Sequence, residues 1–394
     1  MPQADKNQVE VGLALQGGGA LGAYECGAVT ALLELMDGAE ASGRSIKLQC
    51  VAGVSIGAIN AACVVGAESR ADARRRLAAL WDDLTLETPS FWPPEARRDL
   101  ALFGLPGFYA PRPDLWAIST WTSYYDTGQL IGTLERHVDF RALNASETAF
   151  IVTAVDVTSG KLTRFRNRAA RAGQDDDDDP QVDIEPRHIL ASGSLPPQFP
   201  WTKIGDKLFW DGGMVDNAPL GDVIDAFTPV DQRDKIGRLL IAMNLYPLRG
   251  RVPKNLADVE DRAHELQFGN RMRQDHEIAR RINALLETID DLVDLVKDKP
   301  IDQPLQARIY EARLYKILDA ITEIDFQDPS TGPVPRPQDP SDDEAGLRDF
   351  SPPTVARRRR DGYAIAREKL VPLFENHGLA APPADARRRS AAGG

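Results

Sequence analysis

Cysteine, long apolar runs and excess positive charge are all scarce in this chain of 394 residues. The spacing of the three cysteines, Cys26, Cys50 and Cys63, matches no metal motif, and we expect them to be reduced packing residues. No apolar run is long enough to span a bilayer. With 47 Lys and Arg against 59 Asp and Glu, the net charge of −12 argues against nucleic acid and against strong attraction to anionic membranes. The N-terminus lacks the positive-then-apolar pattern of a secretory signal, so we expect a cytoplasmic protein.

The most informative stretch present is Gly53-Val-Ser55-Ile-Gly57, which fits the pattern Gly-x-Ser-x-Gly. Residues 46–51 before it suit a short buried strand, and the Ala-rich residues 56–67 after it suit a closely packed helix. A strand, a sharp turn and a helix in this order form a nucleophile elbow that lifts the serine into the open. The context favours Ser55 as a nucleophile over a Gly-rich turn without a catalytic role.

A second glycine run, from Gly17 to Gly22, follows an apolar strand predicted over residues 9–15 and opens a predicted helix. Consecutive glycines at such a point leave backbone N–H groups uncrowded, so that they can bind a phosphate or the oxyanion of acyl transfer. The run also satisfies the dinucleotide-binding pattern Gly-x-Gly-x-x-Gly. That interpretation requires an acidic residue after the next strand, where this chain has Ser55 in its glycine turn, so it is disfavoured.

A third element lies far downstream. Residues 207–211 predict a hairpin strand that ends at Asp211 and the turn Gly212-Gly213, with Gly205-Asp206 as the hairpin turn. Taken alone, an Asp-Gly pair is most simply a turn filler. A carboxylate can nevertheless take the proton of a serine hydroxyl if burial raises its pKa toward working pH.

These three motifs, in this order and spacing, resemble a patatin-like phospholipase domain extending from about Val9 to Tyr246. The block from Ala191 to Pro200 resembles a further segment of that family. The resemblance implies a three-layer α/β/α fold with a mostly parallel sheet, and a lipid acyl hydrolase that requires no metal or other cofactor. It makes Ser55 the nucleophile and Asp211 the base, with no histidine between them. It assigns the oxyanion hole to the backbone of Gly17, Gly18 and Gly19, and motif support to Gly22, Gly53, Gly57, Gly212 and Gly213.

A conventional triad is the competing mechanism. The order Ser55, Asp156, His188 is open, because Asp156 follows an apolar strand predicted over residues 150–155. His188 stands at a predicted helix start and belongs to no supporting motif. We therefore favour the pair of Ser55 and Asp211.

Helical stretches alternate with four apolar strands, predicted near residues 9–15, 46–51, 150–155 and 238–245. This alternation predicts a mostly parallel sheet covered on both faces. We expect four parts: a patatin-like catalytic domain over 1–250, a helical extension over 251–326, a Pro/Asp-rich linker over 327–355, and a C-terminal helix with a basic tail over 356–394. In the extension, helices are expected over about 254–299 and about 305–322.

Two segments have open roles. Residues 80–121 are rich in aromatic side chains interleaved with prolines, and we expect them either to line or cover an acyl-chain pocket or to form a loop-rich part of the core. Arginines 357–360 are expected to pair within the molecule, with contact to a membrane surface as the alternative.

The sequence thus predicts a serine hydrolase of phospholipase A, lysophospholipase or esterase type, acting on a lipid or small acyl ester. The alternative is an acyltransferase or acyl-binding protein on the same scaffold, in which an alcohol or a thiol replaces water as the acceptor. No nucleic-acid partner is expected. Peripheral membrane contact and a homo-oligomer formed through the C-terminal helices are further expectations.

Overall fold

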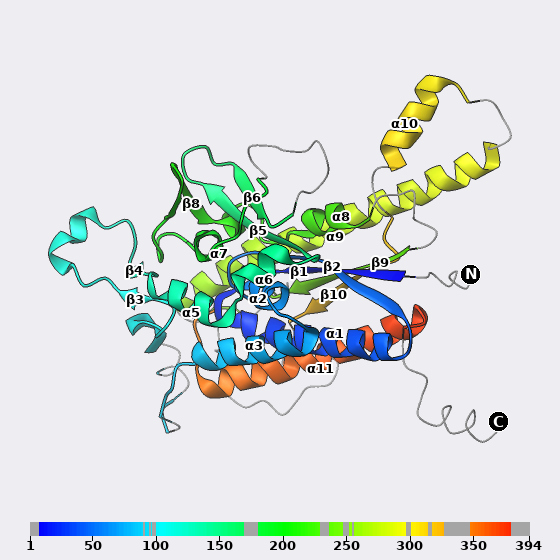
Figure 1. Ribbon diagram of the computed structural model, residues 1–394. Coiled ribbons are helices and arrows are strands. Elements are labelled where there is room, and N and C mark those ends of the chain that lie inside the picture. Colours follow the sequence, from blue (N-terminus) through cyan, green and yellow to red (C-terminus); the bar gives the residue numbers. More distant parts are fainter. Residues whose placement is uncertain are drawn as a thin grey trace, which may run out of the picture.

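The computed structural model describes residues 8–89, 91–93, 96, 100–168, 180–228, 236–246, 252–253, 256–296, 301–313, 317–326 and 347–379. Its main sheet is built from β1 (Gln8–Leu15), β2 (Ser45–Gly53), β5 (Ala149–Asp156), β6 (Leu162–Arg166), β7 (Thr202–Ile204), β8 (Lys207–Asp211), β9 (Ile236–Asn244) and β10 (Ala320–Asp325). These strands lie in the order β10-β9-β1-β2-β5-β8-β7, with β6 also paired to β5 (Figure 1). The four strands predicted from apolar runs are confirmed, and so is the hairpin that leads to Asp211.

The sheet is mostly parallel. Strands β10, β9, β1, β2 and β5 run parallel to their neighbours, whereas β6, β8 and β7 pair antiparallel at the other side. Strand β1 is buried from Val9 to Leu15, because helices cover both faces of the sheet and leave no polar side for solvent. The three-layer α/β/α architecture expected from the sequence is therefore present.

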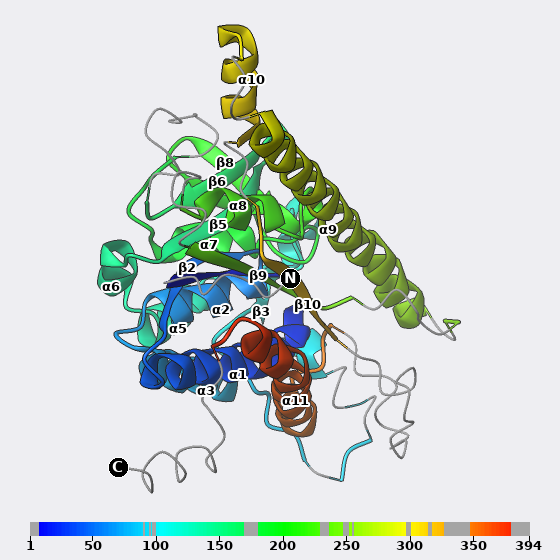
Figure 2. The ribbon, with the colours of Figure 1, turned by 90° about the vertical axis from the view of Figure 1, so that its right-hand side faces the viewer.

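One face of the sheet is covered by α1 (Gly22–Ala41), α2 (Ile56–Val65), α3 (Arg70–Asp83) and α11 (Pro352–Asn376) (Figure 2). The helices α5 (Gln129–His137), α6 (Phe140–Ala145) and α7 (Pro186–Ser192) pack against α2 and α3. The other face carries α8 (Leu220–Ala226) and α9 (Leu256–Val296), with α10 (Gln303–Arg313) beyond them. Within the described residues, no helix combines the length and the apolar character needed to cross a bilayer.

Residues beyond 250 complete this core. The prediction of a helix over about 305–322 is wrong at its C-terminal end. Helix α10 ends at Arg313, and residues 320–325 form the edge strand β10, because pairing with β9 outweighs the local helical pattern. The helices expected around 254–299 and after 356 correspond to α9 and α11. The expected linker is described only from residue 347 and already forms the start of α11, while residues 327–346 and the basic tail after 379 lie outside the described residues. The division into domains stays a prediction.

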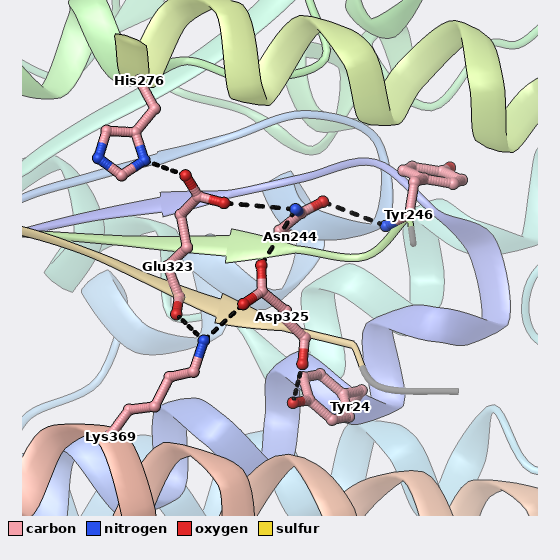
Figure 3. Close-up of polar contacts among 7 residues, drawn as sticks. All are labelled: Tyr24, Asn244, Tyr246, His276, Glu323, Asp325 and Lys369. Atoms are coloured by element: carbon pink, nitrogen blue, oxygen red, sulfur yellow. Dashed lines mark hydrogen bonds and ion pairs between the residues drawn. The ribbon is translucent and has the colours of Figure 1, made fainter. Parts of the chain in front are cut away.

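A polar network fastens these late elements to the sheet (Figure 3). His276 on α9 contacts the Glu323 carboxylate on β10, and Lys369 on α11 donates a hydrogen bond of 2.7 Å to the Glu323 carbonyl oxygen. At the end of β9, the Asn244 side chain donates to Asp325 at 3.2 Å and accepts from the Tyr246 backbone N–H at 3.3 Å. The network therefore fixes the chain where it leaves β9, immediately before Tyr246.

Helices α1 and α11 cross at very short range through two glycines. A Cβ atom added at Gly27 would lie 1.9 Å from the Arg359 carbonyl oxygen, and one added at Gly362 would lie 2.0 Å from that of Tyr24. No rotamer change can relieve such contacts, because backbone atoms occupy the space.

We predict that Gly27→Ala lowers the free energy of unfolding by about 1–3 kcal/mol or more, since overpacking outweighs the gain in helix propensity. Gly38→Ala is the matched control in α1, because nothing lies within 4 Å of an added Cβ there, and it should be neutral or stabilising. Urea unfolding of both variants measures the difference. Equal stabilities would contradict the close crossing of α1 and α11.

Candidate active site

Ser55 occupies a strained turn between β2 and α2. Its backbone has φ 54° and ψ −122°, and no other non-glycine residue in the described structure has a positive φ. Such a conformation persists only where the surroundings enforce it, and it is frequent at active sites. Here the Ser55 N–H donates a hydrogen bond of 2.9 Å to the hydroxyl oxygen of Ser192, which is fully buried on α7. The predicted strand, turn and helix around Ser55 are confirmed.

The predicted glycines lie where other backbone or side-chain atoms approach closely. A Cβ added at Gly57 would lie 2.6 Å from the carbonyl oxygen of Gln16, so α2 can begin directly against the end of β1. At Gly17 it would lie 2.9 Å from the Ser55 Cβ. An added Cβ would come closer than 3.0 Å to another atom at each predicted position: Gly17, Gly18, Gly19, Gly22, Gly53, Gly57, Gly212 and Gly213.

Asp211 ends β8 beside Ser55. Its backbone N–H donates to the Ser194 carbonyl oxygen at 3.0 Å, and its Oδ1 accepts from the Gly213 N–H at 2.8 Å. The Ser55 side chain lies near enough to this carboxyl group to lower its pKa. Only 3% of Asp211 is exposed, and burial raises its pKa to about 7, although the hydrogen bond from the Gly213 N–H and the nearby Ser55 side chain lower it. The structure thus brings the two predicted residues together.

Asn217, in the loop that follows Asp211, is hydrogen-bonded to the glycine loop, which is formed by residues 17–22. The Gly17 N–H donates to Asn217 Oδ1 at 3.0 Å, and Asn217 Nδ2 donates to the Gly17 carbonyl oxygen at 3.1 Å. The Gly17 N–H is therefore engaged within the protein. The N–H groups of Gly18 and Gly19, by contrast, make no hydrogen bond within the part of the chain that the structure describes.

Sequence reasoning assigned no role to several supporting residues. Asn217 could have been found from its place six residues after Asp211, in the same glycine-rich segment. Ser192 and Ser194 lie in the block that resembles the family, but their contacts with Ser55 and Asp211 are long-range. Tyr246 gave no signal: its side chain is buried, and its hydroxyl oxygen would lie 3.4 Å from a Cβ atom added at Gly18.

The residues of the alternative triad are engaged elsewhere. The Asp156 carboxylate accepts hydrogen bonds from the backbone N–H groups of Ser159 and Thr158, which lower its pKa. His188 Nδ1 accepts from the Glu185 N–H at 2.9 Å, and its ring lies against Phe165. Among the described contacts, neither Asp156 nor His188 touches Ser55, so their placement does not support the triad.

A known protein family matches this chain. Residues 13–224, more than half of the chain, match the family described as patatin-like phospholipase. A comparison with curated proteins found no match. Among solved structures, VipD from Legionella pneumophila is 14% identical, with a TM-score of 0.38, and the match covers 93% of this chain and 67% of that chain.

The heterodimeric ExoU–SpcU complex from the type III secretion system of Pseudomonas aeruginosa is also similar, at 15% identity and a TM-score of 0.29. That match covers 79% of this chain and 58% of the other, so the chain spans less than two thirds of that neighbour. The extent of the family match decides the assignment. The chain belongs to the patatin-like phospholipase family, a family of lipid acyl hydrolases.

Proposed function

We propose that this chain hydrolyses acyl esters of lipids through an acyl-serine intermediate, with Ser55 as the nucleophile and Asp211 as the general base. One observation carries the proposal: a serine held at φ 54° lies beside a carboxyl group that is almost fully buried and whose pKa its side chain affects. A strained serine and a carboxyl group with a raised pKa rarely meet by chance, since each is destabilising on its own.

The reaction begins when Asp211 takes the proton of the Ser55 hydroxyl as the serine oxygen attacks the ester carbonyl carbon. The tetrahedral intermediate then collapses, and the proton on Asp211 passes to the leaving alcohol. Water attacks the acyl-serine next, with Asp211 accepting its proton and returning it to Ser55. The same carboxyl group serves as base and acid in turn, so the proton balance closes without a histidine.

A pKa of about 7 suits Asp211 for both roles. A carboxylate with its ordinary pKa is too weak a base to deprotonate a serine at neutral pH. Burial against β5 supplies the shift, because the charged form loses its hydration.

The negative charge that develops on the carbonyl oxygen is stabilised by the N–H groups of Gly18 and Gly19. Each preorganised donor of this kind contributes about 3 kcal/mol to transition-state stabilisation. Gly17 acts differently from its assignment by resemblance, since its N–H is bound to Asn217 and holds the loop in place. The N-terminus of α2, which begins at Ile56, adds a favourable dipole next to Ser55.

Changing either member of the pair should abolish ester hydrolysis. We predict that Ser55→Ala and Asp211→Asn each lower kcat/KM on a short or medium-chain ester by about 10⁴-fold or more. Asp156→Asn and His188→Ala are the matched controls, because these buried groups bond elsewhere, and most of the activity should remain. The reverse pattern, with loss in His188→Ala and retention in Asp211→Asn, would support the triad.

A panel of esters that differ in headgroup and chain length, assayed with and without an added alcohol acceptor, defines the reaction type. We predict hydrolysis of short and medium acyl esters. Transfer to the alcohol without release of free acid would instead indicate an acyltransferase.

Activity should depend on one deprotonation near neutrality. We predict that kcat/KM falls about tenfold per pH unit below a pH of about 7 and is constant above it, because Asp211 must be ionised to accept the proton. Initial rates on a neutral ester across this range test it. A profile that stays flat down to pH 5 would contradict a base with a raised pKa.

Stability gives an independent measure of the same pKa. The pKa of Asp211 is about 7 in the folded chain against an ordinary 3.8, so its contribution to stability is complete below pH 3.8 and is lost as the pH rises to about 7. Asn does not titrate, so the stability of Asp211→Asn relative to the parent should increase over this interval and then level off. Taking the difference cancels other groups, such as Glu25, whose pKa burial raises to about 8.

A further inference from the structure

One segment beside the proposed active site exposes large apolar side chains. We define the aromatic lobe as residues 100–125. It contains two short 3-10 helices, the strand β3 (Ala110–Pro111) and the first residue of the strand β4 (Tyr125–Asp126). The exposed fraction is 76% for Phe103, 69% for Leu115, 85% for Trp116 and 64% for Ile118. A folded chain seldom leaves so many large apolar groups together on one loop unless they bind something.

The base of the lobe packs against the segment that follows Ser192 and Ser194 in the sequence. Phe108 and Tyr109 are buried, and their rings contact Phe199 with centroids 5.9 Å and 5.3 Å apart. The backbone N–H groups of Tyr124 and Tyr125 donate to the carbonyl oxygens of Pro197 and Gln198. Pro197 and Gln198 follow the segment that contains Ser192 and Ser194. In that segment, the Ser192 hydroxyl and the Ser194 carbonyl oxygen accept hydrogen bonds from the backbone N–H groups of Ser55 and Asp211. The segment predicted as either a pocket cover or core is therefore anchored in the core at its base and exposed at its tip.

The lobe lies at the same end of the sheet as the proposed active site. In Figure 1, β3 and β4 lie at the left, at the end of the sheet where α1 begins and where the glycine loop therefore lies. Further exposed apolar side chains come from the neighbouring segments: Trp201 follows Gln198 in the sequence, and Met214 and Val215 follow Asp211. A surface that bound the lobe would therefore lie at the same end of the sheet as Ser55.

The charged residues of the lobe indicate which kind of lipid surface it can bind. The lobe contains only two charged residues, Arg112 and Asp114, and they pair with each other through hydrogen bonds of 3.0 Å and 2.6 Å. Binding to anionic lipid relies on unpaired Lys and Arg, which the lobe does not offer. Elsewhere on the chain, Arg358 is buried and Arg359 pairs with Asp82 at 2.8 Å, so these arginines of α11 are engaged within the protein.

We propose that the aromatic lobe inserts into the surface of a zwitterionic lipid bilayer and thereby brings Ser55 to its substrate. Trp, Leu, Ile and Phe on a neutral loop partition into the interfacial region through apolar burial. This docking mode rests on the proposed function for the identity of the substrate, but the binding itself requires no catalysis.

The experiment uses the full chain with Ser55→Ala, so that vesicles stay intact. Ile118→Cys is labelled with an environment-sensitive thiol dye, and Leu295→Cys, at an apolar position of α9 that is 78% exposed, is the control. The native cysteines are buried, and burial raises the pKa of Cys26 and Cys63 to about 12, so the dye reacts at the introduced thiol. With phosphatidylcholine vesicles, the dye at position 118 should become brighter and shift to the blue, at low and high salt alike, while the dye at 295 should not respond.

A second variant tests the same surface by loss. Combined Leu115→Ser, Trp116→Ser and Ile118→Ser should weaken co-sedimentation with phosphatidylcholine vesicles by on the order of tenfold or more. Replacement of Leu285, Leu292 and Leu295 by serine is the control, because these side chains are also exposed, and it should leave binding unchanged. The proposal is overturned if the dye at 118 does not respond, if binding requires anionic lipid or disappears at high salt, or if the lobe variant instead dissociates an oligomer formed without vesicles.

Discussion

The close approach of three loops at one end of the sheet is the constraint on which the rest of this structure depends. The Gly17–Asn217 hydrogen-bond pair joins segments that are 200 residues apart, and Ser55 lies against Gly17 in the same cluster. Atoms approach so closely there that a Cβ atom added at any of the predicted glycines would lie within 3.0 Å of another atom. The parallel sheet supplies the geometry, because the carboxyl ends of β1 and β2 meet at one edge.

This convergence has an electrostatic consequence. By excluding water from Asp211, the surrounding loops raise its pKa to about 7, which suits the general base that we propose. The same exclusion makes the ionised carboxylate unfavourable in the folded state, so the raised pKa that the proposed catalysis requires reduces stability. The strained φ of Ser55 adds to that cost. Packing elsewhere must therefore offset the free-energy costs of the buried carboxylate and of the strained backbone. The crossing of α1 with α11 and the polar network at β10 are two contributions to that packing.

Much of this arrangement was predictable because it is local. Ser55 and its flanking glycines form one strand–turn–helix unit, and the hairpin before Asp211 is set by two turn residues, so short stretches were sufficient. The edge strand β10 was not predictable in this way, since its conformation comes from pairing with a strand about 80 residues earlier in the sequence. The roles of Ser192 and Tyr246 also depend on partners that only the folded chain brings near. Engagement of the Gly17 N–H by Asn217 is of the same kind, and it moves the proposed oxyanion donors to Gly18 and Gly19.

The most direct measurement of the central claim is the rate at which a fluorophosphonate probe modifies Ser55, mapped by peptide mass spectrometry in the parent and in Asp211→Asn. The probe reports nucleophilicity at one oxygen without any assumption about the natural ester. Selective labelling of Ser55 in the parent, with labelling nearly absent in Asp211→Asn, is the predicted result. Labelling at another residue, or equal labelling of Ser55 in both proteins, would show that Asp211 does not activate this serine.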